Sequence, residues 1–174
     1  VLLTPGANTA LATPQIDISI TLPAGAEVDI TALALEQSGK VRGDEDMLFY
    51  GQPEIHGGAG RLSRSGAQTR FAFDLSRMPA GTDKVMICAT IDGHQTFGDL
   101  PGFPLDALGV ARIDVDTQGR SERALILAEL YMRGGAWKLR AVVQGFNGGL
   151  KTLAEHFGVE IADSPASPPS APPA

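Results

Sequence analysis

Short runs of alternating apolar and polar residues, separated by glycines, constrain this chain more than any other feature. Ile16, Ile18 and Ile20 alternate with Asp17 and Ser19, so one face of this segment can be buried while the other stays wet. Glycine accounts for 21 of 174 residues, and it tolerates the positive φ angles that tight turns require. The pattern predicts many short antiparallel strands.

Other segments repeat this signal. Residues 28–35 are apolar after Thr31, and residues 85–91 are apolar at nearly every position, as expected of interior strands. Residues 47–50, 70–75 and 111–115 predict further strands, and Arg133-Gly134-Gly135 predicts a hairpin turn between residues 124–131 and 136–146. The polar, glycine-rich residues 51–67 predict the longest loop. We expect these side chains to be mostly buried: Ile16, Ile18, Ile20, Leu33, Phe71, Phe73, Ile87 and Trp137.

One segment has helical spacing. Leu150, Leu153, Ala154 and Phe157 recur at i, i+3, i+4 and i+7, and Gly158 follows as a stop. Residues 163–174 hold five of the 12 prolines together with Ser and Ala, which predicts a disordered tail or linker. The sequence therefore predicts an all-β antiparallel β-sandwich with a short C-terminal helix in residues 1–162, followed by the tail.

Charge and composition narrow the function classes. The net charge is −6 and the basic residues are scattered, which argues against a nucleic-acid partner. No apolar run reaches the roughly 20 residues of a membrane span. A single cysteine, Cys88, excludes an intramolecular disulfide. These features predict a cytoplasmic protein with no membrane span.

Catalytic patterns are sparse. Cys88 lies in an apolar run, where a free cysteine usually packs as a small hydrophobe. Asp92-Gly93-His94 with Asp99 is the polar cluster that an enzyme would use, but no nucleophile and base accompany it. The acids of Gly43-Asp44-Glu45-Asp46, with Asp29, suggest either a solvated loop or oxygen ligands for Ca²⁺. We expect no enzymatic activity.

Several motifs resemble the TerD family of tellurium-resistance proteins. VDITALAL at residues 28–35 and GDEDMLFYGQ at residues 43–52 are similar to the paired family motifs FDLDASAFLL and SDEDFVFYNQ. AELY at residues 128–131 and WKLRAVVQGF at residues 137–146, followed by GL and FGV, resemble the family ending GELYR…WKFRAVGQGY…GL…YGV. LTPGAN at residues 3–8 is similar to the opening LTKGQNV. The likeness spans residues 2 to 161.

The resemblance implies a β-sandwich in the bacterial cytoplasm, a stress-response role linked to tellurite, and Ca²⁺ binding by acidic loops without catalysis. It carries Asp29, Asp44 and Asp46 over as metal ligands. The sequence departs from the family at Thr31, which replaces the second acid of DLD. Residues 61–70, RLSRSGAQTR, replace a stretch like GDNLTGEGDGDDE with three arginines and no acid.

These departures predict at most weak Ca²⁺ binding, since calcium affinity depends on the number of ligand charges. One of the arginines Arg61, Arg64 or Arg70 could pair with Asp44 or Asp46 in place of the ion. The leading hypothesis is a non-enzymatic stress-response module with a degenerate calcium site that binds a partner protein or a small ligand. The alternatives are a functional calcium-binding module and an uncharacterised enzyme.

Overall fold

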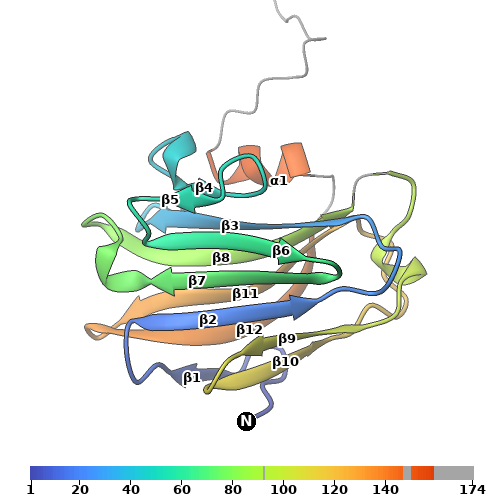
Figure 1. Ribbon diagram of the computed structural model, residues 1–174, viewed down its shortest axis with the longest axis horizontal. Helices are drawn as coiled ribbons and strands as arrows, with labels where there is room; N and C mark the ends of the chain where they lie inside the picture. Colours follow the sequence, from blue (N-terminus) through green and yellow to red (C-terminus); the bar gives the residue numbers. More distant parts are fainter. Residues whose placement is uncertain (92, 147–149, 159–174) are drawn as a thin grey trace, which may run out of the picture.

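The computed structural model describes residues 1–91, 93–146 and 150–158 as two packed antiparallel sheets (Figure 1). The first six-stranded sheet has the order β1-β12-β11-β8-β3-β4, and the second has the order β10-β9-β2-β7-β6-β5. The predicted antiparallel β-sandwich is confirmed. The strands of the first sheet are β1 (Asn8–Ala10), β3 (Val28–Glu36), β4 (Met47–Leu48), β8 (Thr82–Ile91), β11 (Ala124–Arg133) and β12 (Ala136–Phe146). Those of the second are β2 (Gln15–Thr21), β5 (Glu54–Ile55), β6 (Gly60–Ser65), β7 (Gln68–Asp74), β9 (Phe103–Ala107) and β10 (Ala111–Val115).

Short helices complete the described fold. Three are single 3₁₀ turns: η1 (Asp44–Asp46), η2 (Leu75–Arg77) and η3 (Phe97–Asp99). The α-helix α1 (Leu150–His156) lies within the segment whose spacing predicted a helix. None of the described helices has the length and apolar character of a membrane span. The predicted tail, residues 163–174, lies outside the described residues.

The buried residues form two clusters on opposite faces of the first sheet. The larger cluster fills the space between the two sheets and includes Ile18, Phe71 and Ile87. The smaller cluster packs Leu33 and Cys88 of the sheet's outer face beneath residues of the α1 region. Because both faces of this sheet are covered, residues 32–35 are all apolar and residues 85–91 are apolar at nearly every position. All eight side chains expected in the core are buried: Ile16, Ile18, Ile20, Leu33, Phe71, Phe73, Ile87 and Trp137.

The prediction of one long loop over residues 51–67 was wrong, because this stretch contains β5, β6 and the turn that leads into β7. Gly66 turns that hairpin with a φ of 59°, and β6 pairs with β7 along its length from Gly60 to Ser65. β6 buries little of its side-chain surface, so its sequence is polar. Pairing with the amphipathic β7 stabilises a strand whose own residues do not predict one.

The predicted turn between β11 and β12 is confirmed. Gly134 and Gly135 have φ angles of 61° and 80°, as two-residue hairpin turns require. Trp137 and Leu139 are buried on one face of β12, whereas Lys138 and Arg140 on the other are partly exposed. The alternation in residues 136–146 therefore predicted both the strand and its buried face.

Candidate functional site

Asp46 is a fully buried carboxylate at the end of the acidic loop. Its side chain is 0% exposed, although Asp44 and Glu45 of the same 3₁₀ turn are exposed. The turn leads into β4, whose Met47 and Leu48 pack into the two cores. Because Met47 and Leu48 are buried, the adjacent Asp46 is buried as well, and its charge needs hydrogen-bonding or ionic partners within the protein.

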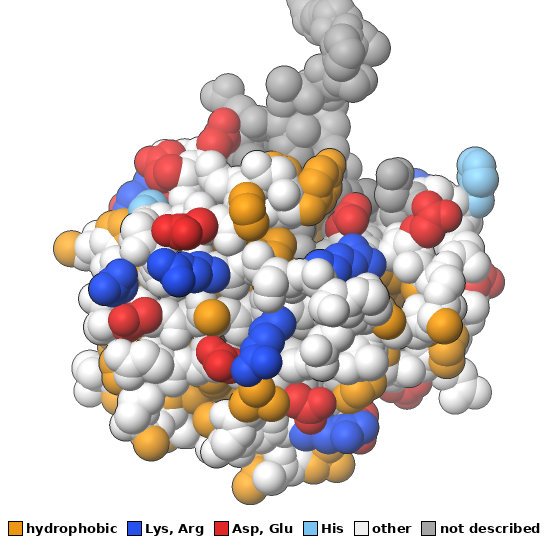
Figure 2. Space-filling view, viewed as in Figure 1, with side chains coloured by type: hydrophobic (Ala, Val, Ile, Leu, Met, Phe, Trp, Pro, Cys, Tyr) orange, Lys and Arg blue, Asp and Glu red, His pale blue; other side chains and the backbone are white. Residues whose placement is uncertain are grey.

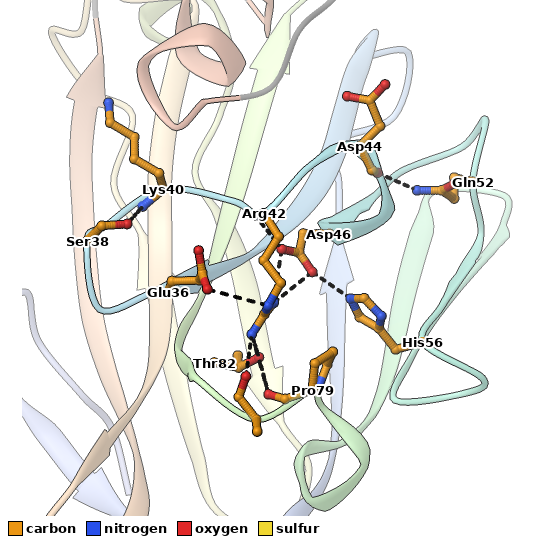
Figure 3. A network of polar contacts seen from close by, with 11 residues as sticks. Glu36, Ser38, Lys40, Arg42, Asp44, Asp46, Gln52, His56, Pro79 and Thr82 are labelled. Atoms are coloured by element: carbon orange, nitrogen blue, oxygen red, sulfur yellow. Dashed lines mark hydrogen bonds and ion pairs between the residues drawn. The ribbon is translucent and has the colours of Figure 1, made fainter.

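Arg42 supplies the positive charge that faces Asp46 (Figure 3). Its backbone N–H donates to Asp46 Oδ2 at 2.7 Å, and its Nη1 lies 3.0 Å from both carboxylate oxygens. Its Nη2 donates to Thr82 Oγ1 at 2.6 Å and to the carbonyls of Pro79 and Ala80 at 3.4 and 3.3 Å. The guanidinium thus ties the acidic loop to the start of β8.

His56 approaches the same carboxylate from the β5–β6 connection. Its Nε2 lies 2.5 Å from Asp46 Oδ1, and its side chain is 14% exposed. A bond to a carboxylate requires a proton on Nε2. His56 has a φ of 50° and precedes Gly57 and Gly58, which also have positive φ. Arg42, Asp46 and His56 form what we call the Asp46 network.

Gln52 fixes the outer side of the acidic loop. Its side-chain nitrogen donates to the carbonyls of Asp44 and Met47, each at 2.8 Å. The loop is therefore held by hydrogen bonds from Arg42 on one side and Gln52 on the other (Figure 3). In this arrangement the Asp44 carbonyl accepts a hydrogen bond, while its carboxylate lies on the exposed surface.

The residues predicted to bind metal occupy different environments. Asp46 lies in its network and Asp44 at the surface, and Asp29 lies on β3, where it lines a cavity. Within the described residues, no three or more His, Cys, Asp or Glu side chains gather as a metal site. Calcium takes roughly six to eight oxygen ligands, but both carboxylate oxygens of Asp46 already accept hydrogen bonds from Arg42 or His56. The described residues do not fit a calcium ion at Asp46.

The arginine that pairs with Asp46 is not one of the three suggested by the sequence. Arg61 pairs with Glu54, and Arg70 pairs with Asp17. These arginines lie on β6 and β7, whereas Arg42 lies two residues before Asp44 in the sequence. Nearness in sequence to Asp44–Asp46 was the signal that could have identified it. Nothing in the sequence marked His56, since the fold alone brings it to Asp46.

A cavity of about 220 Å³ opens beside Asp29. It lies between β3 of one sheet and β6–β7 of the other, next to the β4–β5 connection. Its lining includes Asp29, Ile30, Tyr50, Leu62, Arg64 and Thr69. Thr69 lies on β7 within residues 61–70, the stretch that replaces the family's acids, and its buried hydroxyl has no hydrogen-bond partner among the described residues.

The groups considered for catalysis have structural surroundings. Burial raises the pKa of the Cys88 thiol to about 12, which disfavours the nucleophilic thiolate. Asp99 accepts a hydrogen bond from the Thr96 backbone N–H at 2.9 Å and so caps η3. His94 is exposed, and Asp92 lies outside the described residues.

Comparisons with known proteins agree with this architecture. The sequence model of the TerD domain matches residues 3–157. Tellurium resistance protein TerA of Alcaligenes sp. is 44% identical over 124 residues, which make up 69% of this chain but 37% of that protein. The match thus spans little more than a third of that relative. Tellurium resistance protein TerD of Serratia marcescens is 31% identical over 153 residues, which cover 78% of this chain and 80% of that protein.

A solved structure supports the fold. The crystal structure of a Streptomyces coelicolor homologue of the telluride resistance protein TerD superimposes with a TM-score of 0.65 at 19% sequence identity. The match covers 84% of this chain and 98% of that one. Because the family model matches nearly all of the described residues, this chain belongs to the TerD domain family.

Proposed function

We propose that this chain is a non-enzymatic, cytoplasmic binding module of a bacterial stress response linked to tellurium resistance, and that it works without calcium. Support for the cellular role comes from relatives named for tellurium resistance and from a Bacillus subtilis relative named general stress protein 16U, which is 29% identical. The binding partner is a protein or a small ligand. The single, buried Cys88 fits a reducing compartment.

The observation that carries calcium independence is the pairing of Asp46 with Arg42 and His56. In this proposal the Arg42 guanidinium takes the structural place of a metal ion, because it neutralises the buried Asp46 carboxylate and connects the acidic loop to β8. A divalent ion at Asp46 would have to displace these donors and would lie close to a fixed positive charge. Both effects oppose calcium binding.

Calorimetric titration with CaCl₂ tests this proposal. We expect no binding heat in the micromolar range and no shift in melting temperature at 1 mM CaCl₂, because a ligand at or below its dissociation constant adds at most about 0.4 kcal/mol. Asp46→Asn is the control that separates binding at this loop from binding elsewhere. Micromolar binding that Asp46→Asn abolishes would overturn the proposal and restore a calcium site.

The cellular role has its own test. Deletion of the gene in its native bacterium is expected to increase sensitivity to tellurite, with resistance restored by the intact gene. Restoration by the Asp46→Asn form would leave the stress role intact and separate it from the loop. A deletion strain that grows normally on tellurite would contradict the assignment to tellurium resistance.

A further inference from the structure

The outer edge of β6 is covered along only part of its length. β5 pairs with β6 at Gly60 and Arg61 alone. One residue further, the Leu62 N–H donates to the Pro53 carbonyl at 2.8 Å. Directly opposed residues in such a pair normally exchange two hydrogen bonds, but Pro53 has no N–H to return. The chain therefore leaves the edge of β6 at Pro53.

Beyond this point the backbone of Arg64 faces the open edge. Backbone groups of successive residues in a strand point to alternate sides. Because the Leu62 N–H points away from β7, the N–H and carbonyl of Arg64 point the same way. No described residue forms a backbone hydrogen bond with Arg64 on that side. Figure 1 shows β4 and β5 beside only one end of β3 and β6.

The edge of β3 that faces the open edge of β6 is also partly uncovered. β4 pairs with β3 only at Ala32 and Leu33, so among the described strands none covers the first half of β3 on that side. The 220 Å³ cavity lies between the two uncovered stretches, with Ile30 and Leu62 as apolar lining. A second cavity, of about 300 Å³, adjoins Asp29 and Arg64. Together they form a groove along the edge of the sandwich.

Charge distinguishes Arg64 from its neighbours. Acidic and basic side chains are interspersed over the face shown in Figure 2, and Arg61 and Arg70 are paired with Glu54 and Asp17. Within the described part of the chain, the Arg64 guanidinium forms no hydrogen bond or ion pair. Arg64 lies opposite Thr69 in the β6–β7 register, so its side chain is on the same face of the sheet as Leu62.

We propose that a short extended peptide segment of a partner protein binds this groove as an added strand on β6. Its backbone pairs with the N–H and carbonyl of Arg64, and a carboxylate directly opposite Arg64 pairs with the guanidinium. Pro53 occupies the place opposite Leu62, so the peptide pairs with β6 at Arg64 alone and then leaves the edge. A neighbouring apolar side chain of the peptide enters the cavity beside Ile30 and Leu62. Glu27 on the β3 side of the second cavity disfavours a run of acids, so a single carboxylate fits best. This inference rests on the proposed binding role and names its partner class.

Synthetic peptides provide the test. Four fluorescein-labelled peptides, each about seven residues long so that residues are present on both sides of the Arg64 contact, alternate Thr with a central Glu flanked by two identical residues, Ala, Val, Leu or Phe. Fluorescence anisotropy with the full chain is expected to show binding by at least one of them. Arg64→Ala should weaken that binding about fivefold or more, and replacement of the peptide's Glu by Gln should do the same. N-methylation of the Glu backbone should abolish binding.

Arg70→Ala is the matched control, since Arg70 lies on the neighbouring strand of the same sheet and is paired with Asp17. It should bind the peptides like the parent protein. Failure of all four peptides at millimolar concentration, or equal binding by the Arg64→Ala form, would overturn the inference. Concentration-dependent dimers through this edge would do so as well, by assigning the edge to a second copy. None of these outcomes depends on calcium, so the proposed calcium independence stands or falls separately.

Discussion

At the scale of single residues, Asp46 depends on the two donors around it. A buried carboxylate without partners is strongly destabilising, because it has lost its hydration. Arg42 and His56 compensate for this loss, and Arg42 also binds the carbonyls that precede β8. The positive charge in the network is part of the chain, so its position does not depend on ion concentration.

Replacing Arg42 by Met should therefore destabilise the protein by about 3–5 kcal/mol, the usual cost of removing one partner of a buried ion pair. Urea denaturation measures the change in the free energy of unfolding. Arg61→Met is the control, because Arg61 and Glu54 are exposed and such pairs contribute at most about 1 kcal/mol. Equal stability of the two variants would show that Asp46 does not need Arg42.

At the scale of elements, the strands that the sequence predicted share one property. Each buries alternate residues, as in β2, or buries both faces, as in β3 and β8, so its pattern reflects its own environment. β6 has neither pattern, because it is held mainly through its partner β7. Val143 in β12 shows a similar limit: it has a φ of 47° where the β11–β12 register shifts, and valine gives no sign of a bulge.

The helix α1 is expected to be required for the smaller buried cluster, on the outer face of the first sheet. Leu153 and Ala154 are fully buried there, and the Phe157 carbonyl accepts a hydrogen bond from the Val41 N–H at 2.8 Å. A chain ending at residue 146 should lose at least about 4 kcal/mol of stability, because it leaves apolar surface on β3 and β8 uncovered. Urea denaturation measures this loss.

The reactivity of Cys88 measures whether removal of α1 uncovers this face of the sheet. Cys88 is fully buried in the smaller cluster, so a maleimide reagent should label it slowly in the full chain and much faster in the chain ending at residue 146. Equal labelling rates in the two chains would show that α1 does not protect this face of the sheet.

At the scale of the whole molecule, the sandwich was predictable and the Asp46 network was not. The alternation that specifies the sandwich recurs along the chain, and each occurrence independently supports the same layered fold. The network instead joins Arg42 from the β3–η1 connection, Asp46 from η1 and His56 from the β5–β6 connection. Their meeting depends on how the two sheets stack, which local patterns do not contain. The resemblance to TerD proteins pointed to the acidic loop but not to the arginine that holds it.

One shared core predicts one cooperative unfolding transition. Both sheets contribute to the main cluster, and β3 and β8 contribute to both clusters, so neither sheet can separate without exposing the other. We expect the calorimetric and van't Hoff enthalpies of unfolding to agree. Two resolved transitions would contradict the shared core.

Deletion of residues 165–174 should leave the melting temperature unchanged, because a Pro, Ser and Ala composition offers little apolar surface to bury. A melting temperature several degrees lower after the deletion would show that these residues pack on the sandwich.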